Sequence, residues 1–151
     1  MMLSRVASSI YWMARYMERA DNVARFIDVN THLMLDLTLD RSSTQWYPLV
    51  ATSGDDEDFN KRYTVADEQN VLKFLTFDTK NPNSILQCIF RARENARTVR
   101  EVIPVDVWEN INELYHLTQE HSRKRRVADL TEDYRKVRLT GNMRTGLMAK
   151  S

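Results

Sequence analysis

The chain has 151 residues and a net charge of +1, with 22 basic and 21 acidic side chains. Three glycines and three prolines are too few for the turns of a β-sandwich or barrel, so an all-α fold is expected. The length suits one domain with its own core. The single cysteine, Cys88, excludes an intrachain disulfide and favours a reducing compartment.

Neither a targeting signal nor a membrane segment is expected. The longest early apolar run, residues 10–14, is shorter than the apolar core of a signal peptide, and charged residues follow it directly. No stretch approaches the roughly 20 apolar residues of a membrane span. We therefore predict a cytoplasmic protein.

The first predicted element is one long helix over residues 4–39, which contain neither Gly nor Pro. Its apolar stripe advances in alternating steps of four and three residues, as in helices that pack on other helices. The stripe consists of Val6, Ile10, Met13, Met17, Ala20, Ala24, Ile27, Thr31 and Met34. At ~1.5 Å per residue, this helix would be roughly 54 Å long.

Shorter elements follow. Within the mixed segment 40–60, Pro48 is expected to open a short apolar piece that Ser53-Gly54 ends. A short helix is predicted around residues 67–77, and Asn81-Pro82-Asn83 is typical of a turn.

Two further helices are predicted from their capping residues. Ser84, with Gln87 three positions later, indicates a capping box that opens a helix running to Ile103, before Pro104. Asp106 and Glu109 indicate a second capping box and a second helix. The resulting architecture is an antiparallel helical bundle with one long N-terminal helix.

Beyond Glu120 the apolar periodicity fades. Residues 121–151 hold nine basic and three acidic residues, whereas residues 1–120 hold 13 basic and 18 acidic residues. We therefore divide the chain into a helical-bundle domain over residues 1–120 and an irregular, basic tail over residues 121–151. A basic tail could bind nucleic acid through its run Arg123–Arg126.

The long helix carries a second face, which is polar at first and turns apolar after Asn22, so its far half must be covered. This face consists of Ser4, Ser8, Tyr11, Arg15, Glu18, Asn22, Phe26, Val29 and Leu33. The Ser84 helix has the reverse order, apolar first and then Arg93, Arg97 and Arg100. Because an uncovered apolar stripe favours self-association, a homo-oligomer is expected, most simply a two-fold dimer.

An antiparallel pairing of these two helices would set Ala20 level with Ala96. Glu18 would then lie near Arg97, partly buried and bonded to an arginine other than its neighbour Arg19. The alternative is that Glu18 forms an exposed surface pair with Arg15, three residues earlier in the helix.

The opening segment MLSRVA, residues 2–7, and the segment YWMARYMERADN, residues 11–22, closely resemble the bacterial Alpha-E family of predicted α-helical domains with a Glu-Arg motif. Further similarity lies at Trp46, Pro48-Leu49 and residues 70–78, 81–85 and 91–97, so the likeness covers about residues 2–120. It implies that the Glu-Arg motif is Glu18-Arg19. Since members are typically about twice as long, the chain is interpreted either as an N-terminal half or as a natural short paralogue.

The resemblance implies association with ATP-grasp ligase-like and transglutaminase-like proteins, and it supplies no catalytic residue. The leading hypothesis is a non-catalytic helical interaction module that assists such a partner in peptide ligation or modification. The alternatives are a subunit of a peptide-modifying enzyme that binds an anionic substrate on its arginines, and a nucleic-acid binder. The candidate binding residues are Arg15, Glu18, Arg19, Asn22, Arg93, Glu94 and Arg97.

No metal site and no cofactor are expected. Glu113 and His116 form a Glu-x-x-His step, but a di-iron bundle needs a second such step and two more carboxylates. Asp28 and His32 are equally isolated. Cys88, beside the apolar Ile89, is expected to be a small buried hydrophobe, and Gly-rich phosphate loops do not occur.

Overall fold

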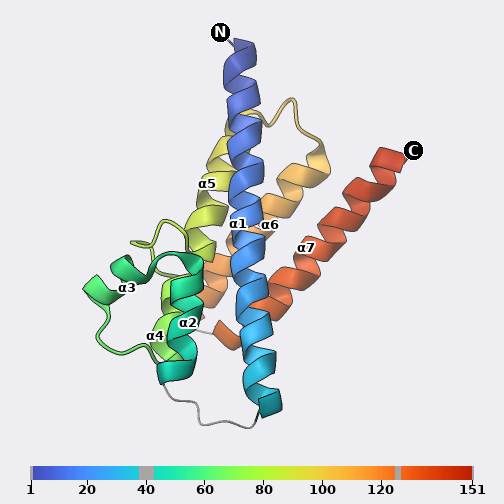
Figure 1. Ribbon diagram of the computed structural model, residues 1–151. Coiled ribbons are helices and arrows are strands. Elements are labelled where there is room, and N and C mark those ends of the chain that lie inside the picture. Colours follow the sequence, from blue (N-terminus) through green and yellow to red (C-terminus); the bar gives the residue numbers. More distant parts are fainter. Residues whose placement is uncertain (1, 38–42, 125–126, 151) are drawn as a thin grey trace.

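Figure 1 shows the computed structural model, in which helices pack around a central long helix. The structure describes the backbone of residues 2–37, 43–124 and 127–150 and the side chains of residues 3–33, 46–124 and 129–141. The helices in these ranges are α1 (Met2–Leu37), α2 (Ser43–Ser53), α3 (Asp56–Arg62), α4 (Glu68–Thr76), α5 (Ile85–Thr98), α6 (Val105–Lys124) and α7 (Val127–Lys150). The predicted all-α fold with a long N-terminal helix is confirmed.

The central part of the predicted α1 stripe forms the core. Met13, Met17, Ala20, Ala24 and Ile27 are all buried, whereas Val6 is half-buried and Ile10 and Thr31, on either side of this central part, are exposed. Neighbouring helices therefore cover the middle of α1 more completely than its ends. The side chain of Met34 and the predicted helix end at residue 39 lie outside the described residues.

Helix α5 packs on α1 more extensively than any other described helix, and the two run antiparallel, as predicted (Figure 1). Their register differs from the prediction. Thr98 Oγ1 donates a hydrogen bond of 3.2 Å to Ser9 Oγ, and the Arg91 guanidinium lies 5.8 Å from the centre of the Tyr16 ring. Both contacts place α5 about nine residues, or roughly 13 Å, from the level that would pair Ala20 with Ala96.

That prediction was wrong because a seam of four-three steps repeats along the helix, so several registers bury it equally well. Ala20 and Ala96 are both completely buried, but at different levels of the bundle. Small residues allow two backbones to approach closely, and the larger side chains around them decide which level is used.

The segment between α1 and α4 is more helical than expected. Pro48 lies inside α2 instead of opening it, so one backbone hydrogen bond of that helix is missing. Gly54 follows with a φ of 83°, a conformation that glycine adopts without strain. The acidic run then forms the first turn of α3, where carboxylates stabilise the positive end of the helix dipole.

The predicted caps are only partly correct. Ser84 Oγ accepts a hydrogen bond of 3.2 Å from the Gln87 N–H and opens α5 as expected. Helix α5 ends at Thr98 instead of Ile103, since consecutive β-branched residues and the following proline disfavour helix there. Helix α6 begins at Val105, so Asp106 lies within its first turn and does not cap it.

The expected irregular tail is wrong. Helix α6 continues to Lys124, and residues 127–150 form α7, whose Leu130 and Tyr134 are buried. Figure 1 shows α7 crossing α1 and then leaning away from it towards the C-terminus. The apolar pattern of α7 is weak because polar contacts and a glycine occupy part of its inner face.

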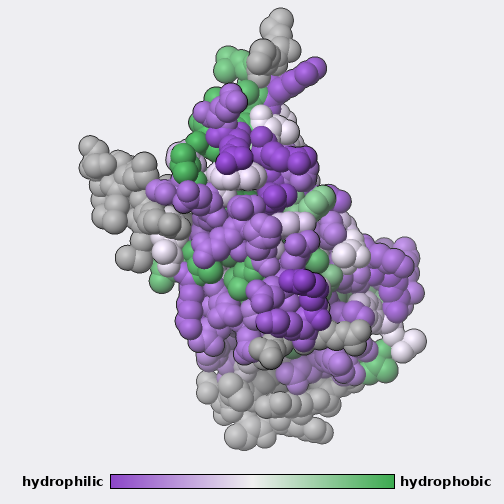
Figure 2. All heavy atoms as spheres, turned by 180° about the vertical axis from the view of Figure 1, so that it is seen from behind, coloured by the Kyte–Doolittle hydropathy of each residue, from purple (hydrophilic) through white to green (hydrophobic). Residues whose placement is uncertain are grey.

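Figure 2 shows the molecule from behind, where polar side chains cover most of the surface. Apolar side chains gather there towards the end that carries the N-terminus. Exposed apolar residues include Leu3 and Ile10 of α1, Val102 of the α5–α6 connection and Val105, the first residue of α6. Among the described helices, none combines the length and the apolar character that crossing a membrane requires.

Candidate functional site

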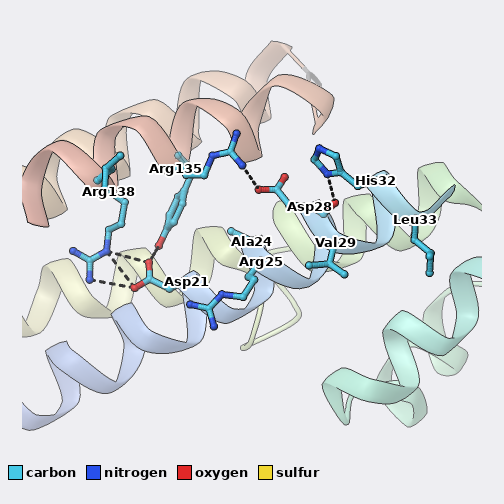
Figure 3. Close-up of a pocket in the computed structure, with 11 residues that line it drawn as sticks. Asp21, Ala24, Arg25, Asp28, Val29, His32, Leu33, Arg135 and Arg138 are labelled. Carbon is cyan, nitrogen blue, oxygen red and sulfur yellow. Dashed lines mark hydrogen bonds and ion pairs between the residues drawn. The ribbon is translucent and has the colours of Figure 1, made fainter. Parts of the chain in front are cut away.

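A carboxylate on α1 is held by two side chains of α7. Tyr134 donates a hydrogen bond of 2.6 Å from its hydroxyl to Asp21 Oδ1. Arg138 donates from Nε to Asp21 Oδ1 at 3.0 Å and from Nη2 to Oδ2 at 3.2 Å. Figure 3 shows Arg138 reaching Asp21 from α7, and Tyr134 lies one turn earlier on the same face, because residues four apart share a helix face. The result is a bidentate ion pair, the stronger kind of Arg–carboxylate contact.

The same network reaches α6 through a buried amide. Arg138 Nη1 donates to Asn110 Oδ1 at 3.1 Å, and Asn110 Nδ2 donates to the Val137 carbonyl at 3.0 Å. Gly141 lies against the Asn110 side chain and leaves no room for a Cβ atom. Burial, with the charge of Asp21 and its hydrogen bond, raises the pKa of Tyr134 well above its usual value. This hydrogen-bond network therefore joins α1, α6 and α7.

Two hollows adjoin the Asp21–Arg138 pair, and together they form what we call the α1–α7 cleft. One is a groove of about 680 Å³, which Figure 3 shows in close-up. It is lined by Asp21, Ala24, Arg25, Asp28, Val29, His32, Leu33, Tyr134, Arg135, Arg138 and Leu139. The other is a pocket of about 310 Å³, lined by Met13, Ala14, Met17, Glu18, Asp21, Val107, Asn110, Ile111, Arg138 and Gly141.

The groove combines apolar surface with charges that pair internally. Val29, Leu33 and Leu139 are exposed, and Arg135 Nη1 lies 3.5 Å from Asp28 Oδ2. Arg25 makes no ion pair or hydrogen bond with the other residues drawn in Figure 3. An apolar surface with a few fixed polar groups is typical of sites that bind ligands or protein segments.

The predicted binding residues of α1 lie on its outer surface. The Glu18 side chain is 62 % exposed and approaches Arg15 Nη1 at 3.4 Å. The prediction of a partly buried Glu18 near Arg97 is therefore wrong, and the surface pair with Arg15 is observed. Arg19 instead lies 5.7 Å from the centre of the Tyr16 ring, the ring that Arg91 of α5 also approaches. Asn22 is half-buried.

The predicted binding residues of α5 are not joined to those of α1. Arg93 lies 4.8 Å from the Tyr115 ring centre and 5.7 Å from the Trp108 ring centre. It also donates a hydrogen bond of 2.9 Å to Asn112 Oδ1, so it packs on α6. Glu94 pairs with Arg97 at 2.8 Å on the surface of α5 itself. The structure thus separates the predicted set, because the register that would have joined it does not occur.

A second polar cluster links α3 to the turn after α4. Asp78 Oδ2 accepts hydrogen bonds from Arg62 and from the Tyr63 hydroxyl, and its Oδ1 accepts one from the Lys80 N–H. Burial raises the pKa of Asp78, but these hydrogen bonds outweigh burial and hold it below its usual value. Burial, followed by the hydrogen bond to Asp78, raises the pKa of Tyr63 to about 12.

The cluster around Asp78 predicts that the stability of the fold decreases at high pH. Because the folded-state pKa of Tyr63 is raised, its contribution to stability is complete below about pH 10, the pKa of a free tyrosine, and is lost as the pH rises towards about 12. The variant Tyr63→Phe should therefore show a smaller fall in melting temperature between pH 10 and 12 than the unchanged chain. An equal fall in both proteins, measured by circular dichroism, would contradict this assignment.

Neither the possible metal ligands nor the one cysteine forms a reactive site among the described residues. No group of three or more His, Cys, Asp or Glu side chains there is arranged to hold a metal ion. His32 Nδ1 contacts the Asp28 backbone carbonyl at 2.7 Å, not its carboxylate. Cys88 is completely buried, as predicted, and burial raises its pKa to about 11, which disfavours the reactive thiolate.

The sequence profile of the Alpha-E family, described as a predicted alpha-helical domain with a conserved ER motif, matches residues 2–151. The chain belongs to the Alpha-E family. The match continues through residues 121–151, for which the sequence motifs showed no likeness. Uncharacterised proteins of Mycobacterium bovis and of Mycobacterium tuberculosis are each 26% identical to it over 117 residues. That similarity covers 69% of this chain and 13% of each relative. No solved structure matches significantly.

Sequence reasoning missed most of the polar network in this Alpha-E chain. Asp21 lies within the segment that carries the family resemblance, but its partners Tyr134 and Arg138 lie in the supposed tail. The signal that could have found them is their spacing of four residues, with Leu130 one turn earlier. Two polar side chains one turn apart beside a buried leucine indicate a helix that offers hydrogen bonds to a neighbour.

Proposed function

We propose that this Alpha-E chain is a non-catalytic, cytoplasmic helical interaction module that assists an ATP-grasp-type peptide ligase or a transglutaminase-like partner. The α1–α7 cleft supports this proposal most directly. Its exposed Val29, Leu33 and Leu139 lie beside internally paired charges, the arrangement with which a groove accepts a helix or strand of another protein. The kind of partner is taken from the family resemblance.

The similarity to the mycobacterial proteins agrees with a modular role. Because it covers 13% of each relative, a related helical segment is one part of a much longer chain there. A segment that recurs inside a longer protein is expected to have a surface on which other parts can dock. The α1–α7 cleft is such a surface here.

The proposal is tested with purified partner protein. The chain is mixed with a purified ATP-grasp-type ligase, and binding is measured by titration calorimetry. Leu139→Asp, which puts a charge on the apolar wall of the cleft, should weaken binding at least ~10-fold, corresponding to ~1.4 kcal/mol. Val102→Asp is the matched control, since Val102 is equally exposed, at 60 % against 58 %, but lies in the α5–α6 connection. Equal affinities for both variants would exclude the cleft.

A second candidate function is supported by Arg19 and Arg91. Both guanidinium groups approach the Tyr16 ring, at 5.7 and 5.8 Å from its centre, so this basic region is the candidate site for a carboxylate or phosphate of an anionic substrate. The nucleic-acid alternative has less support. Several basic residues of α7 pair with acids of this chain, including Arg138 with Asp21 and Lys136 with Glu132.

A further inference from the structure

We infer that the outer face of α1 is the interface of a symmetric homodimer, in which two α1 helices pack antiparallel about an axis between Asp21 and Asn22. This interface shares Arg25, Val29 and Leu33 with the wall of the α1–α7 cleft, so a second copy and an enzyme partner would compete for that part of α1, but the inference does not depend on the proposed function. A second copy of the chain is the occupant, and each copy offers the same surface, as a two-fold interface requires.

The outer face of α1 is uncovered over most of its length. In Figure 1, α1 lies in front, with α5 on one side and α7 on the other. Its exposed side chains advance in steps of three and four residues, which keeps them on one face. They are Tyr11, Ala14, Arg15, Glu18, Arg25, Val29 and Leu33, with the half-buried Asn22 among them. From Tyr11 to Leu33 this face is roughly 33 Å long.

Charge complementarity identifies the occupant and its direction. Glu18 and Arg25 lie at equal distances on either side of the proposed axis, so antiparallel packing brings Glu18 opposite the partner's Arg25, and the symmetry repeats this pair. Both groups are available, because among the described side chains Glu18 pairs only with Arg15, at 3.4 Å, and Arg25 forms no ion pair. In a parallel pair, by contrast, Arg15, Glu18 and Arg25 would each meet their own copy, which costs energy.

The same register also matches apolar side chains. Val29 faces the partner's Ala14, so a branched side chain meets a small one, which allows close approach of the helices. Leu33 lies at about the level of the partner's Tyr11, and both are exposed in the single chain. Asn22 lies beside the axis, where its amide can donate and accept hydrogen bonds with the same amide of the second copy. The apolar C-terminal half of each α1 is thus covered by the N-terminal half of the other α1.

The mass of the protein in solution tests the interface. Light scattering at micromolar concentration should give twice the chain mass of 17.8 kDa. Glu18→Arg alone and Arg25→Glu alone should each give the monomer mass, and the double variant should restore the dimer because the pair is reversed. Glu120→Arg is the matched control, since it removes a comparable exposed pair with Lys124 on α6, and it should stay dimeric. A monomeric unchanged chain, or single variants that stay dimeric, would overturn the inference.

Disulfide trapping tests the direction of the helices. Asn22→Cys should form a covalent dimer on mild oxidation, because the two positions lie beside the axis. Leu33→Cys should not, since the two copies of residue 33 would be at opposite ends of the interface, roughly 35 Å apart. The buried Cys88 provides no competing thiol. A parallel dimer would trap both variants, and this result would contradict the antiparallel arrangement.

Discussion

Asp21→Ala is expected to lower the free energy of unfolding by about 3 kcal/mol, measured by urea denaturation. The substitution removes the acceptor of the Tyr134 hydroxyl and both acceptors of the Arg138 guanidinium. Tyr134 is buried, so its hydroxyl would lose a partner where water cannot easily replace it. The Asp21 and Arg138 side chains are 28 % and 26 % exposed, which places the expected loss at the lower end for a broken buried pair.

Asp28→Ala provides the matched comparison. It removes the same kind of residue from the same helix, and its ion pair with Arg135 also joins α1 to α7. The Arg135 side chain is 61 % exposed, so this loss should stay below ~1 kcal/mol. If the two variants were equally stable, the Asp21 network would be no more than a surface contact.

Gly141→Ala is expected to destabilise the fold by about 1–3 kcal/mol, although alanine normally favours a helix over glycine by ~0.5–1 kcal/mol. Gly141 lies within α7, and an added Cβ would overlap the amide of Asn110. That amide cannot turn away without cost, because it is bonded to the Val137 carbonyl and to Arg138. Either α6 and α7 separate or the hydrogen bonds break. Thermal unfolding followed by circular dichroism measures the loss.

A double variant separates this packing effect from a general defect of α7. In the background Asn110→Ala the overlapping amide is gone and only the Cβ atom of residue 110, at 3.0 Å, stays close, so adding Gly141→Ala should cost much less than in the unchanged chain. Strong non-additivity is expected between residues in direct contact. If Gly141→Ala cost the same in both backgrounds, the close approach of Gly141 to Asn110 would not be its cause.

Local patterns in the sequence predicted the elements whose residues determine their own structure. Ser84 opens α5 with a hydrogen bond to a backbone N–H only three residues away, and such a contact depends on neighbouring residues alone. The central stripe of α1 was likewise predictable, because apolar residues recurring with the helical period must be buried together. Met13 to Ile27 are buried at the expected positions.

The candidate site could not be predicted in the same way, since it joins residues that are far apart in the chain. Asp21 and Arg138 are separated by 117 positions, and nothing in either segment indicates the other. Arg93 shows the same limit within a helix that was predicted. The helix α5 was expected, but the sequence did not show that Arg93 would pack on α6, where it lies near two aromatic rings. A one-dimensional pattern does not specify which helix faces which.

The sequence by itself determined the helical class, the long first helix, the buried centre of that helix and the family. Each of these depends on residue type and spacing within one segment. Only the tertiary structure decided the level at which α5 meets α1, the packing of α7 and the meeting of Asp21, Asn110, Tyr134 and Arg138. The physical reason is that a repeating apolar seam leaves several registers nearly equal in buried area, and the choice among them depends on hydrogen bonds and steric contacts between distant side chains.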